Sequence, residues 1–197
     1  MFLRLAGFIL LALVAVSAHA SETEQLWGAL RAGGNVVLMR HAQTVSGFGD
    51  PPGFRVGDCA TQRNLSADGR EQARRLGAAL KRSGVPIGEV LSSPWCRAVD
   101  TAKLAFGRAQ VWPELSSMHY DRSREAAQND AVRRRITAFR GPGNLFLVGH
   151  SANVISLTGV SLSSGGMVVV APGGPDGFRV LGRLEPDQIL SGQTGPR

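Results

Sequence analysis

Two arginines and two histidines stand where apolar runs of this sequence end. Arg40 and His41 directly follow the run at 35–39, and His150 follows the run at 144–148 after one glycine. Arg97 follows another expected strand, at 89–92, one turn into the next expected helix. Runs of this kind are typical of strands buried on both faces. Because ligands bind beyond the carboxyl ends of parallel strands, we expect the four side chains to meet at one edge of a sheet.

These residue types suit phosphoryl transfer. A guanidinium group stays charged and matches phosphate oxygens in pairs. A neutral imidazole can attack phosphorus and leave again when water attacks, which divides one displacement into two easier steps. Positive charge around the transferred group stabilises the transition state. We expect no cofactor and no metal, since the sequence shows no cluster of carboxylates that could hold an ion.

The elements that must position these residues alternate between strands and helices. This alternation predicts an α/β fold with a mostly parallel central sheet, helices on both faces and a possible antiparallel edge formed by 167–171 and 178–184. A long Gly- and Pro-rich loop spans 40–65 and is expected to be functional. Ser93 is expected to cap a helix whose first residue is Pro94. Other helices are expected at 66–83, 124–139 and 151–158, and the tail after Pro186 is expected to fray.

The chain begins with features of an export signal. In residues 1–20 a single cation, Arg4, precedes an apolar run that ends in Ala18-His19-Ala20, which predicts a signal peptide cleaved after Ala20. Residues 21–197 then form one domain in the periplasm or outside the cell, with no stable membrane insertion after cleavage. The net charge of +7 comes without a long Lys/Arg run or interleaved aromatics, so we expect no nucleic-acid partner. The sequence leaves the oligomeric state open.

Four segments resemble the motifs of the histidine phosphatase superfamily, which is also called phosphoglycerate-mutase-like. Their order and spacing both agree with that family. They are Val36-Val37-Leu38-Met39-Arg40-His41-Ala42-Gln43-Thr44, Asn64-Leu65-Ser66-Ala67-Asp68-Gly69, Ser92-Ser93-Pro94-Trp95-Cys96-Arg97-Ala98-Val99-Asp100-Thr101-Ala102 and Leu147-Val148-Gly149-His150.

The resemblance implies a role for each matched residue. His41 is the expected nucleophile, Arg40 and Arg97 bind the phosphoryl oxygens, and His150 donates a further hydrogen bond to them. Two roles are equally expected for Thr44: it contacts the ligand, or it only closes a turn. The export signal is similar to that of a small exported bacterial branch, which implies a phosphorylated small molecule or an envelope glycolipid as substrate.

The sequence departs from the family pattern in two places. Ala42 replaces the usual glycine and would be strained if that position needs a positive φ. Many members also carry an acid that protonates the leaving group. Here Glu114 is the candidate, with Asp121 and His119 as rivals. Some members that act on phosphohistidine lack this acid.

Cys59 and Cys96 are the two cysteines of the chain. An even count in an exported protein predicts a disulfide. It would pin the loop after His41 beside Arg97. The expected function is therefore a metal-independent phosphatase that hydrolyses phosphomonoesters through a phosphohistidine on His41. The alternatives are a phosphohistidine phosphatase acting on a protein and a phosphate-binding module without turnover, and a mutase fits poorly with export.

Overall fold

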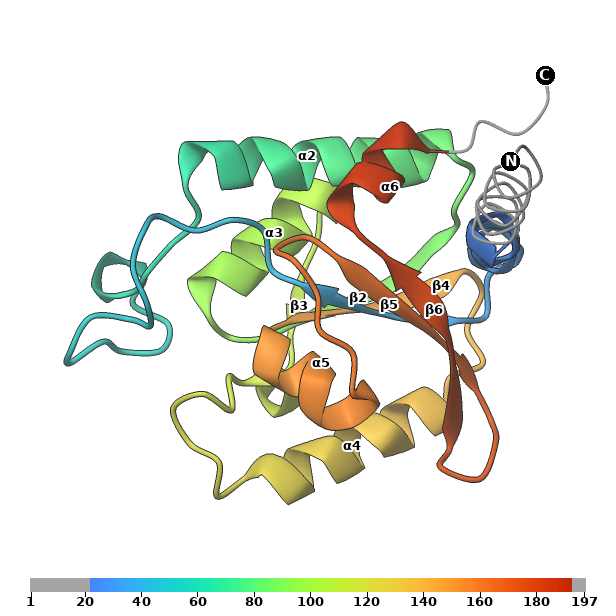
Figure 1. Cartoon of the computed structure of the whole chain (residues 1–197). Helices are drawn as coiled ribbons and strands as arrows, with labels where there is room; N and C mark the ends of the chain where they lie inside the picture. Colours follow the sequence, from blue (N-terminus) through green and yellow to red (C-terminus); the bar gives the residue numbers. More distant parts are fainter. Residues whose placement is uncertain (1–21, 193–197) are drawn as a thin grey trace, which may run out of the picture.

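Six strands form one sheet in the order β3-β2-β4-β1-β5-β6 in the computed structural model, which describes residues 22–192 (Figure 1). Strands β1 (Val36–Arg40), β2 (Ile87–Ser92), β3 (Gln110–Val111) and β4 (Asn144–Gly149) run parallel to one another. Strands β5 (Met167–Pro172) and β6 (Phe178–Leu184) add an antiparallel edge. The expected α/β fold with a mostly parallel sheet is confirmed.

Helices cover both faces of the sheet (Figure 1). On one face lie α2 (Ala67–Arg82), α3 (Cys96–Phe106), α6 (Pro186–Ser191) and a helix at residues 22–32. On the other face lie α4 (Glu125–Thr137) and α5 (Ser151–Thr158). Short 3-10 turns, η1 (Cys59–Thr61) and η2 (Pro113–Leu115), interrupt the loops. Among the helices of residues 22–192, none is long and apolar enough to cross a membrane.

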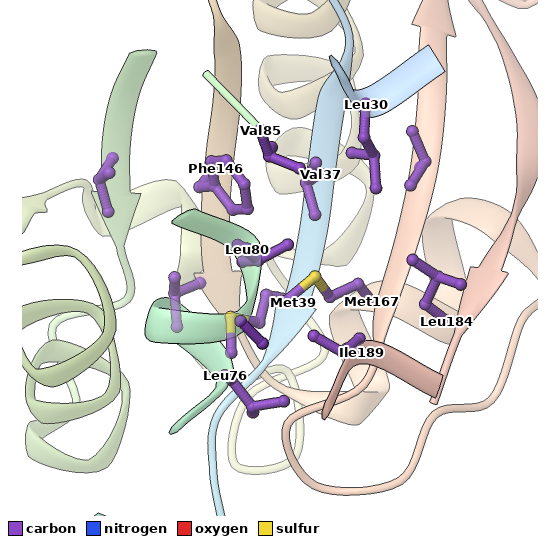
Figure 2. Packing of buried hydrophobic residues seen from close by; sticks show 14 of the residues in the cluster. Leu30, Val37, Met39, Leu76, Leu80, Val85, Phe146, Met167, Leu184 and Ile189 are labelled. Carbon is purple, nitrogen blue, oxygen red and sulfur yellow. The ribbon is translucent and has the colours of Figure 1, made fainter. Parts of the chain in front are cut away.

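The core lies on both sides of strand β1. Val37 and Met39 pack into the cluster under α2 and α6, which Figure 2 shows with Leu76, Leu80 and Ile189. Val36 and Leu38 point the other way, into the cluster under α4 and α5. Successive strand residues face opposite sides of a sheet. A continuous apolar run is therefore what a strand covered on both faces requires.

Two helix starts or ends differ from the sequence-based expectation. Helix α3 begins at Cys96 with Trp95 as N-cap, so the expected start at Ser93 and Pro94 is wrong. The Ser93 hydroxyl is instead engaged by His150. The tail after Pro186 does not fray at once. Helix α6 forms there. A capping box of Glu185 and Gln188 stabilises its N-terminus, and the fully buried Ile189 anchors it. The predicted signal peptide lies outside the described residues.

Candidate active site

The carboxyl ends of strands β1, β2 and β4 bring the expected residues together. Arg40 stands opposite Gly149 in the parallel register, and Ser92 stands opposite Val148. The next residues along each strand are therefore neighbours at one edge. The imidazole rings of His41 and His150 lie with their centroids 5.4 Å apart. His41, Arg97 and His150 are all at least 95% buried.

The ring of His41 is fixed in one tautomer. Its Nδ1 lies 2.8 Å from the carbonyl oxygen of Ala42. Because a carbonyl only accepts hydrogen bonds, Nδ1 carries the proton and Nε2 keeps a free lone pair. Burial is the main cause that lowers the pKa of His41 to about 3, and the charges of Arg97 and Arg40 contribute to this value against the opposing effect of the hydrogen bond to Ala42. The ring is thus neutral over most of the pH range and is held in one orientation.

His150 faces His41 from the end of β4. Its Nε2 lies 2.8 Å from the hydroxyl of Ser93, and the oxygen of that hydroxyl accepts from the backbone N–H of Trp95 at 3.3 Å. Burial, followed by the charges of His41 and Arg97, lowers the pKa of His150 well below its ordinary value. Ser93 therefore orients the second histidine, a role that its position in the sequence did not reveal.

Arg97 is held by a buried carboxylate that sequence reasoning missed. Its Nη1 donates to Oδ1 and Oδ2 of Asp50 at 2.8 and 3.1 Å, and the Asp50 side chain has no exposed surface. Asp50 also accepts from the indole Nε1 of Trp95 at 3.0 Å. Burial alone would raise the pKa of Asp50, but hydrogen bonds and the charge of Arg97 outweigh it and hold the pKa below its ordinary value.

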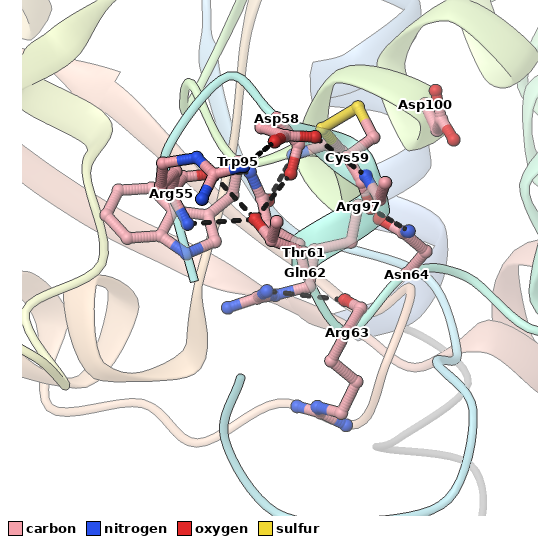
Figure 3. Close-up of a disulfide and its surroundings, with 12 residues drawn as sticks. Arg55, Asp58, Cys59, Thr61, Gln62, Arg63, Asn64, Trp95, Arg97 and Asp100 are labelled. Carbon is pink, nitrogen blue, oxygen red and sulfur yellow. Dashed lines mark hydrogen bonds and ion pairs between the residues drawn. A yellow bond between two sulfur atoms is a disulfide. The ribbon is translucent and has the colours of Figure 1, made fainter. Parts of the chain in front are cut away.

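The loop that carries Asp50 is tied to helix α3. Figure 3 shows the disulfide between Cys59 and Cys96 that joins them, as expected from the cysteine count. Beside it, the backbone N–H of Cys96 donates to Oε1 of Gln62 at 3.0 Å. Cys96 directly precedes Arg97 in the chain. The disulfide therefore couples the conformation of the loop to the position of an active-site arginine.

A pocket of about 420 Å³ opens over the two histidines. Of the residues expected in the site, Arg40, His41, Arg97 and His150 line it. Its remaining walls come from the loop after β1, the segment before α4 and the first turns of α5. They are formed by Phe48, Gly49, Arg63, Ser117, Met118, His119, Tyr120, Arg122, Glu125, Ser151, Ala152, Ile155 and Ser156.

Glu114, the expected proton donor, is not among the residues that line this pocket. Its carboxylate lies 3.5 Å from the guanidinium of Arg124. Of its rivals, Asp121 is exposed and binds Ser123, whereas His119 does line the pocket. Within the described part of the chain, the carboxylate in the lining is that of Glu125, which accepts from the Ser156 hydroxyl at 2.5 Å.

Thr44 contacts the site through Arg63. Its backbone forms an isolated antiparallel bridge with Leu65, and its hydroxyl accepts a hydrogen bond from Arg63. It does not line the pocket. The structure thus places Thr44 against an arginine that the sequence analysis did not single out.

Ala42 is accommodated without a positive φ. In residues 22–192 every residue with positive φ is a glycine. The Ala42 side chain is fully buried against Leu65 and Ala73. Its N–H donates to the hydroxyl of Thr101 at 3.0 Å. The strain considered for this replacement is therefore absent.

Comparisons with known proteins agree with this geometry. A family model described as the histidine phosphatase superfamily (branch 1) matches residues 36–144. The matched residues end before His150. The structure places His150 in the same pocket as Arg40, His41 and Arg97. Comparison with curated protein sequences finds no significant match.

Solved structures with a similar fold include several phosphatases. The protein histidine phosphatase SixA complexed with tungstate has a TM-score of 0.56 at 18% identity, covering 79% of this chain and 99% of its own. A putative alpha-ribazole-5'-P phosphatase from Escherichia coli gives 0.55 at 20%, covering 75% and 96%. A phosphoserine phosphatase mutant from Entamoeba histolytica in complex with phosphoserine gives 0.57 at 12%, covering 79% and 99%. At these identities the likeness shows a shared fold.

Proposed function

This chain belongs to branch 1 of the histidine phosphatase superfamily, and we propose that it hydrolyses phosphomonoesters outside the cytoplasm through a phosphohistidine on His41. As a member of that superfamily it is a phosphatase, a hydrolase. The substrate class, the location and the role of each residue are the proposal. The observation that carries it is the buried pair of His41 and His150 beside Arg40 and Arg97 in one pocket.

The first step forms a bond between Nε2 of His41 and phosphorus, and breaks the bond from phosphorus to the ester oxygen. Arg40 and Arg97 hold the phosphoryl oxygens and offset their charge. His150 donates to the same group. The ester oxygen leaves as an alcohol after taking a proton. In the second step water attacks phosphorus, the N–P bond breaks, and inorganic phosphate is released.

The proton for the leaving alcohol comes from the mouth of the pocket in this proposal. His119 and Glu125 lie there, whereas Glu114 does not. Both side chains have access to solvent. The turnover of a substrate whose leaving group needs no proton should then be less affected by substitution of His119 or Glu125.

Two features support a location in the periplasm or outside the cell. Residues 1–20 have the pattern of a cleaved signal peptide. A disulfide between Cys59 and Cys96 persists in oxidising compartments and is rare in the cytosol. A phosphorylated small molecule or envelope glycolipid fits that location, and we propose this class as the substrate.

The test is to trap the intermediate. Wild-type protein is mixed with radiolabelled p-nitrophenyl phosphate and quenched within milliseconds. We expect acid-labile label on His41. His41→Ala should carry none, whereas the control His119→Gln, altered at another histidine of the same pocket, should still be labelled. Label on a different residue, or hydrolysis that survives in His41→Ala, would refute the proposal.

A second candidate is a phosphohistidine phosphatase, and the position of Glu114 outside the pocket favours it. A nitrogen leaving group needs less help from an acid than an alkoxide does. Comparing kcat/KM for glycerol phosphate with that for a phosphohistidine peptide separates the two candidates. Efficient turnover of the alkyl ester supports the phosphomonoesterase, and turnover of the peptide alone supports the alternative.

A further inference from the structure

A third arginine, Arg63, enters the pocket from the loop after β1. It follows η1 and lines the pocket together with Arg40 and Arg97. Its charge lowers the pKa of both His41 and His150, after burial and the charges of Arg97 and Arg40. A cation with this influence on both rings lies near the place where the phosphoryl group must sit.

The three arginines share an unusual feature. In Arg40, Arg63 and Arg97 the Nε atom is buried and has no hydrogen-bond partner among the described residues. A buried donor left unpaired is destabilising, so three of them in one pocket require an explanation. Nε and one Nη of an arginine can bind two oxygens of a phosphate side by side. A phosphoryl group bound in the pocket that Arg40, Arg63 and Arg97 line together would lie beside donors from all three side chains.

We propose that Arg63 is a third phosphoryl-binding arginine, which completes the anion site formed by Arg40 and Arg97. This inference rests on the proposed function and names a binding residue that neither the sequence motifs nor the family match points out. The orphaned donors and the shared pocket carry it.

The charges of the pocket fit this role. Arg40, Arg63 and Arg97 contribute three positive charges, and the buried carboxylate of Asp50, which pairs with Arg97, removes one. Arg122 and Glu125 also line the pocket and cancel each other, which leaves two net positive charges. A phosphomonoester dianion carries two negative charges near neutral pH. With only two arginines, the Asp50 carboxylate would leave a single net positive charge. Arg63 therefore restores the match between the net charge of the pocket and that of the dianion, which Asp50 would otherwise remove.

The loop holds Arg63 in place by several contacts. The backbone N–H of Arg63 donates to Oδ1 of Asp50 at 2.7 Å, and its guanidinium donates to the hydroxyl of Thr44. Its carbonyl oxygen accepts from Nη1 of Arg97 at 3.4 Å. An arginine held this way loses little conformational freedom when it binds an anion, so more of its interaction energy contributes to affinity.

The experiment measures the binding of inorganic phosphate by titration calorimetry at low ionic strength. Phosphate has no leaving group, so any effect concerns the phosphoryl site itself. The variants are Arg63→Gln, which removes the charge, and Arg63→Lys, which keeps the charge and loses the planar fork. The control is Arg74→Gln, an exposed arginine that pairs with Glu71 on the outer side of α2.

We expect Arg63→Gln to weaken phosphate binding by about 10- to 100-fold, as loss of a charge-assisted hydrogen bond in a shielded site implies. Arg63→Lys should fall between this variant and wild type, and Arg74→Gln should bind within twofold of wild type. Wild-type affinity in Arg63→Gln would overturn the proposal. If Arg63→Gln does not fold, Arg63→Lys decides: a loss of threefold or more supports the proposal, and unchanged affinity overturns it.

Phosphate binding does not require turnover, so the two proposals can fail separately. A protein that binds phosphate through Arg63 but never forms a phosphoenzyme would refute the proposed function and keep this inference. A protein that turns over normally with Arg63→Gln, and binds phosphate as wild type does, would refute this inference and keep the proposed function. A raised KM for a charged ester, with phosphate binding unchanged, would place Arg63 against the leaving group and also overturn the proposal.

Discussion

Removing the disulfide should weaken both the fold and the anion site. Cys59 and Cys96 are separated by 37 residues. For a closed loop of this length, the chain-entropy model gives about 4 kcal/mol of stabilisation. At about 2–4 °C per kcal/mol for a domain of this size, the double variant Cys59→Ser/Cys96→Ser should melt about 8–16 °C below wild type.

The loss should extend beyond stability because of what the loop carries. Asp50 and Arg63 both lie in or beside the segment that the disulfide holds against α3. At a temperature where the double variant is folded, phosphate should therefore bind several-fold more weakly than to wild type.

Calorimetric melting of wild type and of the double variant, each with and without reductant, measures the first effect. Phosphate titration measures the second. Reductant should leave the double variant unchanged, which serves as the control. A double variant that melts within about 2 °C of wild type and binds phosphate equally well would refute the reasoning.

The remaining predictions concern packing, charge and protonation. Gly77→Ala should lower the free energy of unfolding by about 3 kcal/mol, because the new Cβ would lie 1.9 Å from a backbone oxygen of α3. Gly28→Ala is the matched control in open space and should stabilise by about 0.5–1 kcal/mol; similar urea midpoints for the two would contradict this. Asp50→Asn should cost about 3 kcal/mol at pH 7, since it breaks the buried pair with Arg97. The pKa of Asp50 is lowered in the folded state, so the stability that the ion pair gives wild type is lost as the pH falls below about 4. A difference in unfolding free energy between wild type and Asp50→Asn that grows in acid would contradict this. His41 has a pKa of about 3 in the folded protein. NMR titration should therefore find its ring neutral at pH 5, and stability should fall as the pH drops from about 6.5 toward 3, where only the unfolded chain takes up the proton; a midpoint near 6.5 would exclude a buried neutral ring.

The sequence by itself determined the sheet and the residues at its active edge. In the run before Arg40, residues 36–39 are all apolar, whereas a strand covered on one face only would alternate apolar and polar residues. Alternation with helices then made the sheet mostly parallel. The chemistry followed from what stands after each run, because strand ends fix the place of the next residue to within a few ångströms. His41 and His150 could therefore be predicted to meet without any contact being known.

Only the tertiary structure decided which loop residues complete the site. Asp50 and Arg63 belong to a long segment without periodicity, and nothing local distinguishes them from other charged loop residues. Their roles arise from contacts with Arg97, which lies in another part of the chain, and with Thr44, at the other end of the same loop. Ser93 shows the same limit. Its neighbours suggested a helix cap, but a hydrogen bond to His150 competes for its hydroxyl. Local propensity is worth about 1 kcal/mol at a helix cap, and a long-range contact in a buried site can outweigh it.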